Sequence, residues 1–229
     1  MRILLIHTAG SQGSIALADT ALEEAIVAAE VLPGRTSSER LVPAIRRAMD
    51  ACGWRLKDLA AVVVVHGPGS FTGVRVGLSA AKGLSEAGDV PLIAVSRLAL
   101  LAARVDGEAQ TVHAVLDAGR GEFYLGDYVG RRCLREVLLS GKDLPAAAAG
   151  GVVVACEAGV GEALAGLTPR IVEEALAGDA LPLARERIEA ADFDDAALLD
   201  ANYLRRTDAE IFTKPAAGRI ANRRLRDEG

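Results

Sequence analysis

The sequence predicts an α/β protein with two related lobes, each a mixed sheet with flanking helices. The main observation is a repeat of organisation: a strand hairpin opens the chain, a second hairpin follows residue 107, and helix and strand patterns alternate after each. Composition agrees, because 51% of the residues are hydrophobic but only 3% are aromatic. A core of Ala, Val and Leu suits helices packed on a Val-rich sheet. On the pattern alone, a single doubly wound domain remains the alternative.

The first predicted lobe covers residues 1–106 and ends at a polar, glycine-containing break at 106–108. Residues 62–65 are apolar without alternation, as in a strand covered on both faces. Leu41 and Ile45 belong to an apolar row at helical spacing, which predicts an amphipathic helix. Strands are expected over 2–7, 14–18, 24–31, 62–65 and 92–95, and helices over 39–51, 71–87 and 97–105.

The second predicted lobe, with a basic tail, covers residues 107–229. Its hairpin turns at 117–121, where an Asp-Ala-Gly-Arg-Gly run is typical of a tight connection. Asp117 is interpreted as a turn-stabilising residue, in preference to an acid–base pair with Glu122. Strands are expected over 111–116, 122–129 and 152–155, and helices over 142–149, 157–167 and 181–191.

A glycine-rich turn directly after the strand at 62–65 is the most informative local motif. Glycines permit backbone angles closed to other residues, and a Ser or Thr here can cap the following helix. The turn either presents N–H groups to an anion or is only a tight strand-to-helix corner, and local chemistry leaves both open. No Lys-Ser or Lys-Thr follows it, which excludes a P-loop, and its spacing differs from a Gly-x-Ser-x-Gly elbow. The residues of this turn are Gly67, Pro68, Gly69, Ser70, Thr72 and Gly73.

Charge and cysteine usage narrow the class of protein. A formal net charge of −5 argues against a stand-alone binder of nucleic-acid backbone. The cysteines Cys52, Cys133 and Cys156 are far apart without zinc-ligand spacing, which indicates reduced thiols. No apolar run approaches the length of a membrane span. We therefore expect a soluble, cytoplasmic protein that does not enter the membrane.

The residue strings point to a family more specifically than the periodicities do. The matching segments occur in order along nearly the whole chain, at 2–9, 14–17, 67–77, 81–84, 117–124 and 203–205. With the string Gly-Pro-Gly-Ser-Phe-Thr-Gly-Val-Arg-Val-Gly at 67–77, the chain closely resembles the TsaB (YeaZ) family. The resemblance implies two actin-like lobes of the ribonuclease H-like ASKHA class. It also implies a role in making N6-threonylcarbamoyladenosine in tRNAs that read codons beginning with A.

The resemblance implies a binding role within an enzyme complex. Members of this family are non-catalytic partners of the transferase TsaD, with which the ATPase TsaE associates, and they form homodimers when alone. The tRNA is then contacted indirectly, through the complex. No cofactor is expected for this chain itself, and ATP or ADP is expected only at the interface with TsaD.

Departures from the catalytic pattern support a non-catalytic reading. The catalytic paralogue is expected to hold a metal with a His-x-x-x-His pair, but the equivalent stretch at 36–43 has no histidine. His7 stands where the family usually has an Asp that organises magnesium-bound phosphate. A metal pair of His7 and His66 is the less favoured alternative to hydrogen-bonded strand-end histidines. No catalytic or metal-binding residue is assigned; the alternatives are a stand-alone glycoprotease-type peptidase and an actin-like ATPase.

The resemblance places the partner interface on the two long helices of the first lobe, which would form a helix bundle with TsaD. The alternative is that these helices only pack on their own sheet. The basic tail is interpreted as a solubilising terminus in preference to a contact with tRNA phosphate, and its cations are Arg219, Arg223, Arg224 and Arg226. The predicted interface residues are Arg46, Arg47, Asp50, Arg75, Leu78, Ser79, Lys82 and Glu86.

Overall fold

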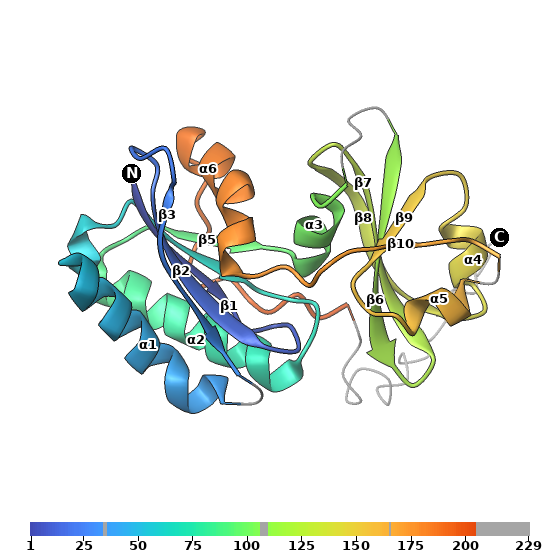
Figure 1. Ribbon diagram of the computed structural model, residues 1–229, viewed down its shortest axis with the longest axis horizontal. Helices are drawn as coiled ribbons and strands as arrows, with labels where there is room; N and C mark the ends of the chain where they lie inside the picture. The colour runs from blue at the N-terminus through green and yellow to red at the C-terminus, as the bar shows by residue number, and fades with distance from the viewer. Residues whose placement is uncertain (34–35, 106–109, 165, 205–229) are drawn as a thin grey trace, which may run out of the picture.

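The computed structural model describes residues 1–33, 36–105, 110–164 and 166–204, and the predicted basic tail lies outside this part of the chain. It contains two five-stranded mixed sheets that stand beside each other, each with flanking helices (Figure 1). The predicted fold class is thereby confirmed, and the two-sheet form replaces the alternative of a single doubly wound domain. Within the described residues, no helix combines the length and the apolar character that crossing a membrane requires.

The first sheet has the strand order β3-β2-β1-β4-β5. Its central strand β1 pairs antiparallel with β2 and parallel with β4, so that Leu4 lies between Leu17 and Val62. All three of these side chains are fully buried, as expected for a central strand covered on both faces. The strands are β1 (Arg2–His7), β2 (Gly13–Asp19), β3 (Ile26–Leu32), β4 (Ala61–Val65) and β5 (Leu92–Val95).

Two long helices, α1 (Ser37–Cys52) and α2 (Phe71–Gly88), cover one face of the first sheet (Figure 1). The C-terminal part of α1 ends at Gly53, whose left-handed backbone makes it the predicted stop. A single 3-10 turn, η1 (Leu56–Asp58), connects α1 to β4. The other face is covered by the 3-10 turn η2 (Ala177–Ala180) and the helix α6 (Leu181–Glu189), from the far end of the chain.

The second sheet repeats the connectivity of the first. Its order is β10-β9-β6-β7-β8, so β6 takes the central place of β1, with antiparallel β7 on one side and parallel β9 on the other. Two of its strands, β8 and β10, have no counterpart in the sequence prediction, and β6 continues beyond the predicted end at 116. The strands are β6 (Thr111–Gly119), β7 (Glu122–Val129), β8 (Arg132–Ser140), β9 (Val152–Ala155) and β10 (Arg170–Ile171).

The helices of the second lobe are shorter than predicted. The structure has α4 (Leu144–Ala147) and α5 (Val160–Ala163) in place of helices over 142–149 and 157–167. Glycines at 150, 151, 159, 161 and 166 flank or interrupt these segments, and glycine disfavours helix. Both helices pack on the outer face of the second sheet, through apolar side chains such as Leu144 and Val160.

The third helix of each lobe packs on the other lobe. The helix α3 (Arg97–Ala102) follows β5 but contacts β6, β7 and β9, and Leu98 and Leu101 lie in the core of the second lobe. Conversely, the chain leaves β10, returns across the molecule and forms α6 on the first sheet (Figure 1). The predicted second range, 107–229, thus includes a segment that packs with the first sheet.

Candidate functional site

The glycine-rich turn forms a corner pressed against the end of β1. Ser70 caps α2, since its Oγ accepts a hydrogen bond from the N–H of Gly73 at 3.2 Å, and the Ser70 N–H itself donates to the Ala9 carbonyl at 2.8 Å. A Cβ added at Gly73 would lie 2.0 Å from the Thr8 carbonyl oxygen. Gly69 has a φ of +155°, and a Cβ added there would lie 2.1 Å from the Ala9 carbonyl oxygen. The corner therefore requires glycine for backbone contact.

A polar cavity of about 510 Å³ opens between this corner, the β1–β2 loop and the start of α1. The first residues of α1 and α2 both border it, so the cavity faces two helix N-termini. None of the described residues that line it carries a charge. The lining consists of Thr8, Gly10, Ser11, Gln12, Gly13, Ser37, Ser38, Ser70, Phe71, Thr72, Gly73 and Val76.

His7 ends β1 and is almost completely buried. Its Nδ1 accepts a hydrogen bond from the Ala9 N–H at 3.2 Å, and its Nε2 has no hydrogen-bond partner among the described residues. Burial, assisted by the positive charge of Arg97, lowers the pKa of His7 to about 4. The ring is therefore neutral at pH 7 and carries its proton on Nε2, because Nδ1 is the acceptor.

The other histidines bond elsewhere. Nδ1 of His66 lies 3.0 Å from the Val95 carbonyl oxygen, and Nδ1 of His113 lies 2.7 Å from Asp127. Across the part of the chain that the structure describes, there is no group of three or more His, Cys, Asp or Glu side chains placed to hold a metal. In the second hairpin, the Asp117 carboxylate accepts the N–H of Gly119 at 2.6 Å, which is the predicted turn-stabilising contact.

Ion pairs connect the two lobes beside the β1–β2 loop. The buried guanidinium of Arg97, at the start of α3, lies 2.6 Å from Glu174 and 3.3 Å from Glu157. Glu174 also accepts hydrogen bonds from the N–H (2.9 Å) and the hydroxyl of Ser11. Glu157 accepts the Asp117 N–H at 2.6 Å. Burial opposes ionisation of Glu174, but the bonds from Ser11 and the charge of Arg97 outweigh it, and the pKa of this carboxyl is lowered.

A second polar cluster joins the lobes on Glu136, in β8. Its carboxylate accepts hydrogen bonds from the hydroxyls of Ser96 and Tyr128 and from the side-chain amide of Asn202, the last at 2.6 Å. Burial and the neighbouring Glu136 raise the pKa of Tyr128, so this phenol stays protonated and acts as a donor. Both inter-lobe clusters are satisfied internally and hold the lobes in one arrangement.

The exposed face of α2 carries an aromatic–arginine cluster formed by Phe71, Arg75 and Tyr203. The guanidinium carbon of Arg75 lies 3.7 Å above the centre of the Phe71 ring, and its Nε donates to the Tyr203 hydroxyl at 2.7 Å. The two rings are 6.0 Å apart between centres. Phe71 is nevertheless 56% exposed, as is the apolar Val42 on α1. The cluster thus combines exposed aromatic and arginine side chains, the types that are enriched at protein interfaces.

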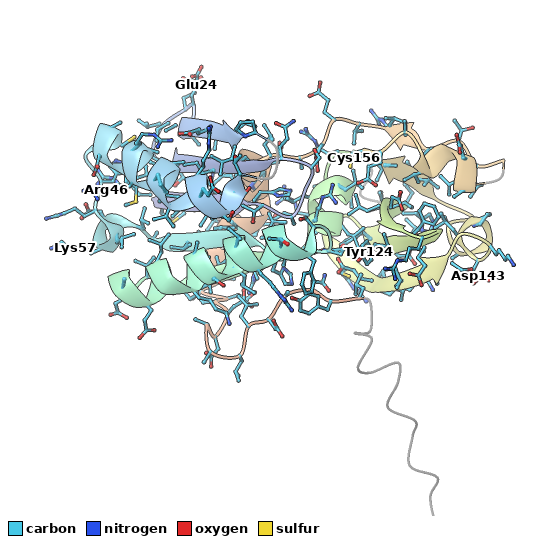
Figure 2. The ribbon with its side chains drawn as sticks, turned by 90° about the horizontal axis from the view of Figure 1, so that it is seen from below. Glu24, Arg46, Lys57, Tyr124, Asp143 and Cys156 are labelled. Carbon is cyan, nitrogen blue, oxygen red and sulfur yellow. The ribbon has the colours of Figure 1, made fainter. Side chains whose placement is uncertain are left out.

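Seven of the eight predicted interface residues fall into three groups. Arg46 and Arg47 extend from α1 into exposed ion pairs with Asp50 and Glu30, and Figure 2 shows Arg46 pointing away from the molecule. Lys82 is half-buried and donates to the Leu199 carbonyl. Exposed positions on α2 are Arg75, Ser79 and Glu86.

Leu78 is the exception among the predicted interface residues. It is only 6% exposed and lies in the core of the first lobe. The reason is helical spacing, since Leu78 shares the inward face of α2 with Val74 and Ala81. Leu78 therefore does not belong to the exposed surface.

Sequence reasoning missed several residues of these sites. Phe71 and Tyr203 carried a signal, because both lie inside the matched residue strings at 67–77 and 203–205. The sequence carries no signal for the pair of Arg97 and Glu174, since the two residues are 77 positions apart and belong to different segments of the fold.

Comparisons with known proteins agree with this architecture. Residues 31–226 match the family model described as TsaD: tRNA N6-adenosine threonylcarbamoyltransferase. The chain is 38% identical over 138 residues to the "tRNA threonylcarbamoyladenosine biosynthesis protein TsaB" of Bacillus subtilis. The matched stretch covers 59% of this chain and 58% of the relative. The chain is also 38% identical over 131 residues to the protein of that name from Escherichia coli, covering 56% of this chain and 55% of the relative.

A solved structure extends the similarity to nearly the whole molecule. It is an uncharacterized Pseudomonas aeruginosa protein "with similarity to peptidase YEAZ", with a TM-score of 0.73 at 30% identity, covering 89% of this chain and 99% of that one. By contrast, the matched sequence spans just over half of the length of the two curated relatives. The two-lobed actin-like fold expected from the residue strings is confirmed by these similarities.

Proposed function

This chain belongs to the TsaB (YeaZ) family, within the wider group that the TsaD family model describes, and from that membership we propose that it is a non-catalytic partner subunit in the synthesis of N6-threonylcarbamoyladenosine in tRNA. It binds and activates a TsaD-like transferase in the cytoplasm, together with a TsaE-like ATPase. The tRNA is contacted through the complex, and the chain pairs with a second copy when the transferase is missing.

The observation that carries this proposal is the aromatic–arginine cluster on α2. Tyr and Arg are enriched among the residues that dominate binding energy at protein interfaces, and rigid aromatic rings lose little entropy on binding. Here Arg75 is already held between Phe71 and Tyr203 before any partner arrives. On the adjacent helix α1, Val42 is a further exposed apolar side chain. A helix pair of the partner can pack on this surface, because Ser79 and Gly83 permit close approach.

The chemistry at the end of β1 supports a binding role in preference to phosphoryl transfer. His7 is buried and neutral there, and Mg²⁺ prefers oxygen ligands. The contacts of Ser70 do not support a peptidase mechanism, because among the described residues its hydroxyl contacts the Gly73 N–H and no histidine ring that could act as a general base. We propose no cofactor for this chain itself. ATP or ADP is proposed only at the interface with the transferase, where the polar cavity beside Phe71 would face the partner.

The experiment is size-exclusion chromatography of the chain with its cognate TsaD-like protein, with and without ATP. The wild type is expected to co-elute, whereas Arg75→Glu should weaken the complex about 30-fold or more, as for loss of a residue worth roughly 2 kcal/mol. The matched control is Arg185→Glu on α6, which makes the same charge change at an exposed arginine on the opposite face of the lobe.

Two outcomes would contradict the proposal. Arg75→Glu and Arg185→Glu variants that bind equally well, with normal tRNA modification in cells, would remove the proposed surface. Peptidase or ATPase turnover by the purified wild type, abolished by a single substitution in the polar cavity, would instead support one of the two enzymatic alternatives.

A further inference from the structure

The opening hairpins of the two lobes, β1–β2 and β6–β7, each donate a backbone N–H to a glutamate. In the first lobe, the Ser11 N–H after β1 donates to Glu174, and in the second lobe the Asp117 N–H donates to Glu157. Both carboxylates also contact one guanidinium, that of Arg97. Glu174 and Glu157 come from the segments that follow β10 and β9, so neither contact results from local sequence.

The contacts of Glu174 are those that a protein offers to an oxyanion. The carboxylate receives a backbone N–H, a hydroxyl and a guanidinium N–H, and charge-assisted bonds of this kind are the strong ones. Gly10 makes room for it, because a Cβ at this residue would lie 2.2 Å from Glu174 Oε1. Arg97 has an exposed side-chain fraction of only 8%, so its charge is held in place by the surrounding core.

We propose that Ser11, Arg97 and Asp117 form an oxyanion site between the lobes that Glu174 and Glu157 fill as internal ligands, so that a phosphate group reaches the Ser11 and Arg97 donors only when the Glu174 carboxylate is removed. The site is open to solvent from the side of Ser11, which is exposed, and Glu174 itself is one-quarter exposed. Because the two carboxylates already occupy these donors, the phosphates of a nucleotide do not fit at this place in the native chain. The proposal is independent of the docking surface, which lies on the outer faces of α1 and α2.

The test is a calorimetric titration of the full chain with inorganic phosphate at constant ionic strength. Glu174→Ala is expected to bind phosphate in a saturable manner, with a dissociation constant at least about 10-fold lower than that of the wild type, because a charged hydrogen-bonding competitor has gone. The control is Glu173→Ala, which removes the same charge from the exposed neighbouring residue and should behave as the wild type. Adding Ser11→Ala to Glu174→Ala should weaken binding again by several fold.

If Glu174→Ala does not fold, as judged by circular dichroism, Glu174→Gln supplies the same test. It removes the charge while its amide still occupies part of the site, so it should bind phosphate more tightly than the wild type, by a smaller factor than the one expected for Glu174→Ala. Phosphate affinity of the folded variant equal to that of Glu173→Ala would overturn the proposal. A gain in affinity that Ser11→Ala leaves unchanged would also overturn it, by placing the phosphate elsewhere.

Discussion

The two lobes have the same strand connectivity, but their helices differ in length. In the first lobe, α1 and α2 have 16 and 18 residues, whereas their counterparts α4 and α5 have 4 each. A long amphipathic helix buries one face on the sheet and leaves a second face for a partner. A single turn has only enough surface to pack on its own sheet. The comparison teaches that the long helices of the first lobe leave room for the proposed binding surface, whereas the single turns of the second lobe do not.

The largest contrast between the lobes should appear in their packing. Leu5 in β1 is fully buried, whereas Leu138 in β8 is only partly buried at the edge of the second sheet. Leu5→Ala should lower the free energy of unfolding by about 3–4 kcal/mol, and Leu138→Ala by about 1 kcal/mol. Urea denaturation of both variants measures this. Equal losses would show that the edge of the second lobe is packed as tightly as the centre of the first.

The junction between the lobes should depend on one buried cation. Arg97→Met leaves Glu157 and Glu174 without their shared partner and should cost about 3 kcal/mol. The control is Arg104→Met, which breaks the more exposed pair with Asp179 and should cost less than about 1 kcal/mol. Urea denaturation at pH 7 compares them. Similar losses for the two variants would mean that the buried ion pairs contribute no more than surface ones.

The same junction should respond to acid in a definite direction. The pKa of Glu174 is lowered in the folded chain, so its contribution to stability is present above the ordinary pKa of 4.5 and is lost as the pH falls below it. In Arg97→Met part of the cause of that shift is gone. The variant should therefore lose less stability than the wild type between pH 5 and pH 3.5, which denaturation curves at the two pH values can measure.

Each lobe contains a buried histidine, and the two differ in their partners. His113 pairs with Asp127, whereas Nδ1 of His7 receives only a backbone N–H. Because folding lowers the pKa of His7 from 6.5 to about 4, the unfolded chain binds the extra proton between these values, and stability falls as the pH falls through this range. From pH 7 to pH 5 the loss should be about 2 kcal/mol.

A non-titrating variant isolates this effect. His7→Gln should lose less stability than the wild type over the same pH interval, as measured by urea denaturation at pH 7 and pH 5. An identical pH dependence in both proteins would show that His7 is not the group responsible.

Two glycines of α2, whose counterpart α5 in the second lobe is a single turn, should respond to alanine in opposite ways. Gly73→Ala adds a methyl group against the Thr8 carbonyl and should cost about 1–3 kcal/mol. Gly83→Ala meets nothing within 4 Å and should stabilise the isolated chain by about 0.5–1 kcal/mol, since alanine favours helix. The melting temperature should therefore fall in Gly73→Ala and rise in Gly83→Ala. A shift in the same direction would mean that α2 is not held against β1 as closely as described.

Sequence reasoning succeeded where a segment is long or uniformly apolar. The predicted ends of β1, β5, β7 and β9 match the observed ones, because each is a run rich in apolar side chains that is followed by polar or turn residues. The strand β8 was missed because its first half, Arg132–Arg135, is exposed and charged, as at a sheet edge. The two-residue β10 has too few residues to show any period.

The candidate sites were less predictable, because they depend on contacts across the fold. The exposed row of α2 followed from helical spacing, yet the same spacing places Leu78 inward. The partner of Arg75 is Tyr203, which the chain brings back only after completing the second lobe. Nothing in the neighbourhood of Glu174 in the sequence indicates that it contacts Ser11, since that contact depends on how two sheets are joined.

The exchange of α3 and α6 makes each half of the chain depend on the other for its completion. A fragment ending before α6 would expose the apolar face of the first sheet, and a fragment lacking α3 would do the same to the second. Either half expressed without the other should therefore be prone to aggregation.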